Sequence, residues 1–339
     1  MLSYQIDVYR KSGERCKSFW HFLLFISFFP KLPMGPIVRY DSISHQLTNR
    51  EVDPKSIFDG SLRFVLGLSK KVLLADPLFR TYEQFLNQQS ALSAWLAAFS
   101  FTLYIYFEFS GYADMAIGLG KVFGFSLPEN FHKPYSASSI SEFWRRWHIS
   151  LGSFFRDYVY IPLGGNRCGL LRQIMNLLIV WCLTGLWHGF QFSFVIWGMY
   201  FFLLISAEKI LGLMKIRFPS ILGRLFSLIF ILYGWVIFSS NDPMSLITFT
   251  IRLFSFSAAS ASPAFLVLKN SLPLLLIGTL LSFFAPVCKE KCMAYLSGKP
   301  HRTAAFVTFC QGILILILMV LCTTSLIAAA SKPSMYIGF

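Results

Sequence analysis

A stretch of 35 residues, 173–207, contains no Asp, Glu, Lys or Arg, and it restricts the fold more than any other feature of the sequence. A single helix of that length would be about 52 Å long, whereas the hydrocarbon core of a membrane is about 30 Å thick. The stretch therefore predicts two membrane helices. We place the break at residues 185–189, where Gly185 and Gly189 flank a segment that contains His188.

Further apolar runs and the composition indicate a polytopic membrane protein. The chain has 339 residues, of which 55% are hydrophobic and 14% charged, and its formal net charge is +14. Soluble domains contain about 25% charged residues, and one of this composition would expose large apolar patches. The basic residues lie mostly between apolar runs, which favours cationic loops at a membrane over nucleic-acid binding. The other long uncharged runs are 91–107, 225–241, 270–288 and 303–331.

Two loops rich in basic residues, 208–224 and 289–302, suggest an orientation, because the positive-inside rule predicts that both are cytoplasmic. An even number of crossings must then separate them. We expect 225–241 and 270–288 to cross the membrane. The run 253–268, which is rich in Ser and Ala and contains Pro263, should lie at the interface or re-enter. With no internal repeat, the whole chain, 1–339, is expected to form one membrane domain.

His188 is the only histidine in the uncharged stretch 173–207. Ionisable residues inside membrane segments are rare and by default suggest a functional site. With an unperturbed pKa of about 6.5, a histidine can accept and return a proton near neutral pH. A buried histidine bonded to a backbone carbonyl fits the spacing alone as well as a catalytic histidine does.

Charged and aromatic residues crowd together in the middle of the chain. Glu142 precedes Arg145 and Arg146 by three and four positions, a spacing typical of ion pairs on a helix. We expect this group to anchor the segment at the cytoplasmic face, where guanidinium groups can also bind phosphates of a donor. Trp144 and His148 are four positions apart, which predicts that His148 packs beside the Trp144 indole.

Several motifs resemble those of the membrane-bound O-acyltransferase (MBOAT) family and favour its bacterial alginate O-acetyltransferase branch. In chain order they are Met34-Gly35-Pro36-Ile37-Val38-Arg39, Phe109-Ser110-Gly111-Tyr112-Ala113-Asp114-Met115-Ala116-Ile117-Gly118, Trp144-Arg145-Arg146-Trp147-His148, Arg156-Asp157-Tyr158, Pro162-Leu163-Gly164-Gly165-Asn166-Arg167, Gly185-Leu186-Trp187-His188-Gly189 and Gly234-Trp235-Val236-Ile237-Phe238. The resemblance runs from about Ser3 to the C-terminus. Family members carry further helices before the matching segment, so the comparison predicts that this chain lacks the family's N-terminal helices.

The resemblance implies an all-α, polytopic transmembrane protein of the bacterial cytoplasmic (inner) membrane, with an MBOAT-type helical core and re-entrant or interfacial segments. It implies a tunnel open to both membrane faces, in which His188 acts in acyl transfer and His148 lies nearby as a second catalytic residue. His188 is expected to take the proton from an acceptor hydroxyl as the hydroxyl attacks the acyl carbonyl. The expected donor is acetyl-CoA or another acyl thioester, with no bound cofactor and no metal.

The expected acceptor is an extracytoplasmic polysaccharide such as alginate. Besides membrane lipid and the acyl donor, the expected partner is an extracytoplasmic acetyltransferase or a protein like the SGNH hydrolases, and no nucleic acid is expected. The candidate substrate-binding residues are Arg145, Arg146, Asp114 and Asn166. Asp114 fits equally a structural hydrogen bond at a helix end and a polar group that lines the tunnel. Asn166 lies in a glycine-rich turn that lacks the lysine of a nucleotide-binding loop.

Alternatives remain open at the level of sequence. D-alanyl-type transfer or peptidoglycan O-acyl transfer would use the same kind of histidine motif. A truncated, non-catalytic remnant would keep the motifs without a complete tunnel. An ion-coupled transporter would use Asp114, His148 and His188 as a proton path, but it predicts internal repeats and charged residues spread over several spans, which the sequence does not show.

Overall fold

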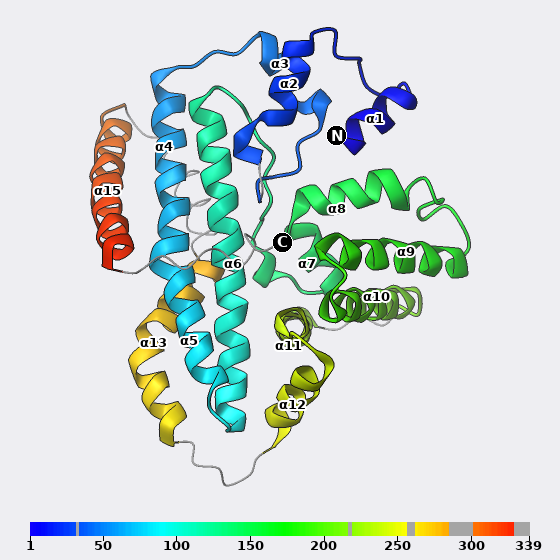
Figure 1. Ribbon diagram of the computed structural model, residues 1–339, viewed down its shortest axis with the longest axis vertical. Coiled ribbons are helices and arrows are strands. Elements are labelled where there is room, and N and C mark those ends of the chain that lie inside the picture. Colours follow the sequence, from blue (N-terminus) through cyan, green and yellow to red (C-terminus); the bar gives the residue numbers. More distant parts are fainter. Residues whose placement is uncertain (32–33, 216–218, 256–261, 285–300, 329–339) are drawn as a thin grey trace.

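The computed structural model describes the chain apart from residues 32–33, 216–218, 256–261, 285–300 and 329–339 (Figure 1). Every regular element in the described part is a helix. Six helices there are long and apolar enough to cross a membrane: α6 (Ala91–Val122), α9 (Leu170–His188), α10 (Phe192–Leu213), α11 (Ser220–Ser239), α13 (Ser262–Phe283) and α15 (His301–Ala328). The predicted all-α, polytopic membrane fold is therefore confirmed.

The remaining helices are shorter or more polar. They are α1 (Leu2–Tyr9), α2 (Phe19–Ser27), η1 (Phe29–Lys31), α3 (Tyr40–Thr48), α4 (Pro54–Ser69), η2 (Lys70–Ala75), α5 (Asp76–Leu86), η3 (Pro134–Ser136), α7 (Ile140–Arg146), α8 (Ile149–Phe155), η4 (Arg156–Tyr160) and α12 (Pro243–Phe254). Two of them, η2 and η4, are turns of π-helix, a geometry that is frequent at functional sites.

The uncharged stretch 173–207 forms parts of two helices, as its length predicts. The break lies slightly later than we placed it, because α9 continues through Gly185 and ends at His188. Gly189 has a φ of +139°, a conformation that residues with a Cβ rarely adopt, and it lets the chain turn back into α10 within three residues. His188 therefore lies at the tip of a tight helical hairpin.

Residues 253–268, predicted to form one interfacial or re-entrant segment, include parts of two different helices. α12 ends at Phe254, and α13 begins at Ser262 and continues through Lys269 to Phe283. The predicted crossing of 270–288 therefore starts earlier than the uncharged run does. Most of the second basic loop, 289–302, lies outside the described residues, so the proposed orientation of the chain stays a prediction.

α4, η2 and α5 form one helical run that packs along α6, the long helix at the centre of Figure 1. Two pairs of glycines bring the backbones into contact, because a Cβ at Gly118 would lie 2.6 Å from the carbonyl oxygen of Gly60, and one at Gly67 would lie 2.5 Å from that of Gly111. In each helix the glycines are seven residues apart, about two turns, so they lie on one face.

Charged side chains between α4, η2 and α6 are joined in ion pairs. Asp114 accepts hydrogen bonds from Arg63 at 2.8 Å and from Lys70 at 2.6 Å, and Arg63 also pairs with Glu129. Lys71 binds the buried Glu108 at 2.7 Å. These pairs explain how an apolar chain accommodates carboxylates in its longest helix.

The N-terminal helices are attached to the centre of the chain through polar contacts. Arg39 binds Asp157 of η4 at 2.6 Å, and the Tyr158 hydroxyl donates to Asp7 at 2.6 Å. The backbone N–H of Ile37 donates to the Ser150 hydroxyl of α8 at 3.0 Å. α8, α9 and α10 run across the direction of α4 and α6 (Figure 1).

Candidate active site

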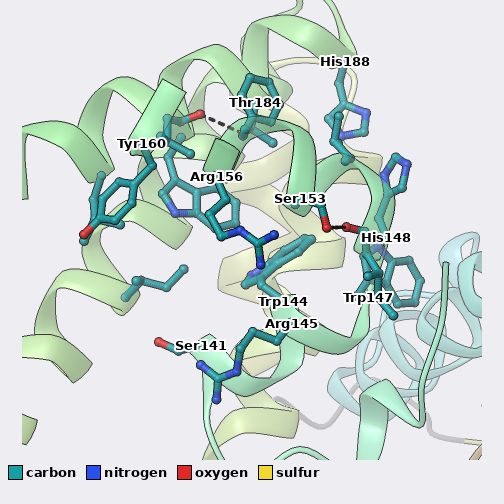
Figure 2. A pocket seen from close by; sticks show the side chains of 18 of the residues that line it. Ser141, Trp144, Arg145, Trp147, His148, Ser153, Arg156, Tyr160, Thr184 and His188 are labelled. Carbon is teal, nitrogen blue, oxygen red and sulfur yellow. Dashed lines mark hydrogen bonds between the residues drawn. The ribbon is translucent and has the colours of Figure 1, made fainter. Parts of the chain in front are cut away.

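A cavity of about 430 Å³ is lined by side chains of α6 to α11 and η4 (Figure 2). His148 and His188 lie at one end of it, and their imidazole rings are next to one another in Figure 2. Arg145 and Arg156 line another part of the wall. None of the described residues that line the cavity is acidic. The cavity thus combines two imidazoles with two guanidinium groups, and that of Arg156 is paired with Asp157.

Aromatic side chains form a large part of the cavity wall. Five of the eight tryptophans line it, namely Trp144, Trp147, Trp181, Trp197 and Trp235. Their rings contact one another, with centroids 5.3 Å apart for Trp144 and Trp197 and 4.8 Å apart for Trp147 and Trp235. Because large aromatic rings pack rigidly, they hold the cavity open without filling it.

His188 is held at the end of α9 by four aromatic rings. The rings of Trp187, Phe194, Trp197 and Phe238 lie with centroids 4.9 to 5.9 Å from the imidazole centroid. Within the described part of the chain, the imidazole forms no hydrogen bond. This observation disfavours a histidine that is bonded to a backbone carbonyl and leaves both ring nitrogens for a ligand.

His148 lies outside helix α7, contrary to the sequence prediction. α7 ends at Arg146, Trp147 is extended, and His148 adopts the left-handed conformation at the start of α8. The predicted packing on Trp144 is therefore wrong, because the spacing rule requires a helix that continues to residue 148. The His148 ring instead contacts Phe109 at 4.7 Å and Trp187 at 5.7 Å, so Trp187 touches both imidazoles.

Only 6% of His148 is exposed, and burial lowers its pKa to about 3, with a further contribution from the neighbouring His188. Burial acts in this direction because it disfavours the charged imidazolium. His148 is therefore neutral at physiological pH. A neutral imidazole offers one N–H donor and one nitrogen acceptor.

The structure separates the two neighbouring arginines of α7. Arg145 is exposed, lines the cavity and forms no hydrogen bond with any residue that the structure describes. Arg146 points elsewhere, where it binds Glu142 and the Ser136 hydroxyl. The predicted ion pair with Glu142 is thus confirmed for Arg146, and Arg145 is left available for a ligand.

The other two candidate substrate-binding residues do not line the cavity. Asp114 is paired with Arg63 and Lys70 as described above, an arrangement that matches the structural alternative. Asn166 accepts hydrogen bonds from the Tyr160 hydroxyl at 2.7 Å and from Lys209 at 3.0 Å. A role in substrate binding stays a prediction for both.

Sequence reasoning did not select Arg156 and Tyr160 of η4, which line the cavity. Arg156 lies in one of the motifs quoted above, and that motif was the only available signal. The described residues contain no group of three or more His, Cys, Asp or Glu side chains placed to hold a metal ion.

Comparison with known proteins decides the family. The model of the membrane-bound O-acyltransferase family matches residues 14–247, which include every residue discussed for the cavity. The chain belongs to this family. The resemblance noted from the motifs is therefore confirmed, and the MBOAT chain described here is a multi-pass membrane protein.

Three relatives show which branches of the MBOAT family are similar. A protein named "Probable alginate O-acetylase", from Pseudomonas putida, is 41% identical over 245 residues, or 71% of this chain and 50% of that protein. The peptidoglycan O-acetyltransferase of Helicobacter pylori is 40% identical over 66% of this chain and 45% of its own length. The teichoic acid D-alanyltransferase of Bacillus subtilis is 28% identical over 65% of this chain and 61% of its own length. This chain thus spans about half the length of the first two relatives.

Proposed function

We propose that this MBOAT chain transfers an acyl group, most simply acetyl, from a cytoplasmic thioester to a hydroxyl of an extracytoplasmic polysaccharide. The observation that carries the proposal is the cavity in which His148 and His188 lie side by side without hydrogen bonds to described residues. Family membership and the acetyl-transferring relatives support the reaction type.

His188 acts as the general base in this mechanism. It takes the proton of the acceptor hydroxyl while the hydroxyl oxygen bonds to the acyl carbon, and the carbon–sulfur bond then breaks. The proton passes from His188 to the departing thiolate, so the thiol leaves neutral and His188 is regenerated. Neutral His148 supplies a hydrogen bond inside the same cavity. A positioned general base contributes about 10²–10⁴-fold to such a reaction.

Arg145 binds the donor, whereas the Arg156 guanidinium is already paired with Asp157 at 2.7 Å. A thioester such as acetyl-CoA carries phosphates, and a guanidinium group binds phosphate through two parallel hydrogen bonds. The absence of acidic residues among the described cavity-lining side chains favours an anionic ligand. The imidazoles receive the acyl end of the same donor.

The proposed location is the bacterial cytoplasmic membrane, where the donor is on one side and the polysaccharide on the other. Alginate is the first candidate acceptor and peptidoglycan the second, because the relatives named for these acceptors have nearly equal identity to this chain. We propose that an extracytoplasmic acetyltransferase or an SGNH-hydrolase-like protein receives the acyl group and completes the transfer.

Deletion of the gene tests the proposal and identifies the acceptor. O-acetyl content is measured in each exported glycan before deletion, after deletion and after complementation with the complete reading frame. We expect one glycan to lose its acetyl groups and to regain them on complementation. Unchanged acetylation of every exported glycan would contradict the proposed function.

A further inference from the structure

We propose that Asn130 is a positioning residue for His148. It holds two adjoining segments of chain together so that the imidazole enters the cavity beside His188. The catalytic meaning of this arrangement rests on the proposed function, whereas the arrangement itself is a property of the fold. Asn130 does not line the cavity and is 1% exposed.

The backbone conformation of His148 is unfavourable by itself and needs stabilising contacts. Its φ and ψ angles are +45° and +53°, in the left-handed region that residues with a Cβ adopt at a cost of about 1–3 kcal/mol. Such a conformation persists only where surrounding contacts determine it. It turns the chain sharply after α7, and this turn is the reason that the ring reaches the cavity instead of continuing along the helix.

Residues 130–132 provide these contacts on both sides of His148. Before it, Phe131 and Trp147 form an antiparallel bridge, and the His132 N–H donates to the carbonyl of Arg146 at 2.9 Å. After it, the Ile149 N–H donates to the carbonyl of Asn130 at 3.0 Å. Trp147 and Ile149, the residues on either side of His148, are thus both attached through the backbone to residues 130–132.

The Asn130 side chain completes the attachment. Its Oδ1 accepts from the backbone N–H of Ser150 at 3.1 Å and from the Ser150 hydroxyl at 2.6 Å. Removal of this oxygen would leave two buried donors without a partner, which typically costs about 1–3 kcal/mol per group. Its Nδ2 forms no hydrogen bond with any described residue, so Asn130→Asp loses no observed bond and keeps the acceptor.

The His148 ring depends on this backbone attachment for its orientation. No described residue forms a hydrogen bond with the imidazole, and Phe109 and Trp187 are among its aromatic neighbours. Loosening of the backbone therefore lets the ring leave its place. A displacement of about 1 Å can lower a reaction rate by about 100-fold.

Chemical modification tests the arrangement without an activity assay. Membranes that contain the full chain are treated with diethyl pyrocarbonate, which reacts with neutral imidazole, and the products are digested with trypsin. Cleavage after Arg146 and Arg156 yields the peptide 147–156, in which His148 is the only histidine. Mass spectrometry of this peptide gives the modification rate of His148, with His188 as an internal reference in another peptide.

We expect Asn130→Ala to raise the modification rate of His148 relative to His188 about fivefold or more, because local opening exposes a ring that is otherwise buried. Asn130→Asp keeps the acceptor oxygen but buries a carboxyl group, so the modification rate of His148 should rise less than in Asn130→Ala. Ser150→Ala removes the hydroxyl bond to Asn130 and the bond from the Ile37 N–H but keeps the backbone bond to Asn130. It should also raise the rate, and it covers the case in which Asn130→Ala does not reach the membrane. Asn176→Ala is the matched control, since Asn176 is 3% exposed and donates to the carbonyl of Leu163 far from His148.

A rate for His148 that is unchanged in Asn130→Ala and Ser150→Ala would overturn the proposal, as would an equal rise in Asn176→Ala. Acyl transfer from acetyl-CoA in the same membranes then separates this result from the proposed function. Asn130→Ala should lower kcat about 10-fold with little change in the KM for the donor, because Arg145 is untouched. If modification changes as expected but no His188-dependent transfer occurs, the proposed function fails and the positioning role of Asn130 stands.

Discussion

Two regions of this chain place charged or titratable groups among apolar helices, and they treat those groups in opposite ways. Between α4, η2 and α6, Asp114, Glu108 and their basic partners are all joined in ion pairs. In the cavity, His148, His188 and Arg145 form no hydrogen bonds with described residues. His148 is buried and His188 partly buried among aromatic rings, whereas Arg145 is exposed.

We interpret the paired side chains as groups that stabilise the fold, and the side chains without a protein partner as groups that bind a ligand. A buried polar group without a partner costs free energy, so a chain retains one where a ligand supplies the missing bond. A paired group has already met its requirement inside the protein. From this contrast we propose that Asp114 serves the fold and that the two histidines serve the chemistry, although all three are ionisable residues near membrane spans.

The largest expected effect is that of His188→Asn. Asparagine keeps a similar size and a hydrogen-bonding group but cannot accept a proton near neutral pH, so acyl transfer should fall by about 100-fold or more. The measurement is O-acetyl content of the exported polysaccharide at equal protein level in the membrane. His45→Asn, on the surface of α3, is the control. Near-normal acetylation in His188→Asn would contradict a catalytic role for His188 and would show that the lack of a protein partner does not mark a catalytic group.

Asp114→Ala should lower stability rather than chemistry. Without the carboxylate, Arg63 loses one of its two partners and Lys70 loses its ion pair, which should cost about 2 kcal/mol since the groups are only partly exposed. Thermal unfolding in detergent measures this loss. Asp59→Ala, which breaks the more exposed pair with Lys121, should change stability much less. A lower rate of acyl transfer per folded molecule would instead show that Asp114 takes part in the reaction.

The neighbouring arginines offer a smaller but sharper contrast. Arg145→Lys keeps the charge but loses the two-pronged geometry, so the donor KM should rise about fivefold. Arg146→Lys should leave the donor KM unchanged and slightly lower stability, because Arg146 binds Glu142 outside the cavity. Kinetics at varied acetyl-CoA concentration measure both. Equal changes in the two variants would show that the cavity does not bind the donor phosphates.

The smallest expected effect concerns pH. Burial lowers the pKa of His148 to about 3, so its proton is already lost well below pH 6 and its charge does not change between pH 6 and 8. His148→Gln should therefore lower the transfer rate by a constant factor across this range. The transfer rates of His148→Gln and of the chain with His148 are measured at several pH values, and their ratio should be constant. A ratio that varies with pH would mean that His148 titrates in the working enzyme.

The sequence predicts the helical hairpin of α9 and α10 because membrane thickness limits helix length, which is a local constraint. It does not predict the helical run of α4, η2 and α5, since Lys70 and Lys71 interrupt the apolar pattern and their partners come from α6. The same reason explains the error at His148, whose conformation depends on pairing with residues 130–132. Arg145 and Arg146 are equivalent in sequence, and only the rotation of about 100° per helical residue separates them.

The contacts of the N-terminal segment have a consequence for the order of assembly. Ile37 reaches Ser150, and Arg39 reaches Asp157, so these bonds join residues 113 and 118 positions apart. A chain is synthesised from its N-terminus, and hairpins such as α9–α10 close as soon as their second helix emerges. The helices α1, α2 and α3 pack on one another through Tyr4, Phe25 and Tyr40, and they contact α8 and η4 only later. The segment that carries Ile37 and Arg39 is attached to η4 only after every residue up to 157 has been made.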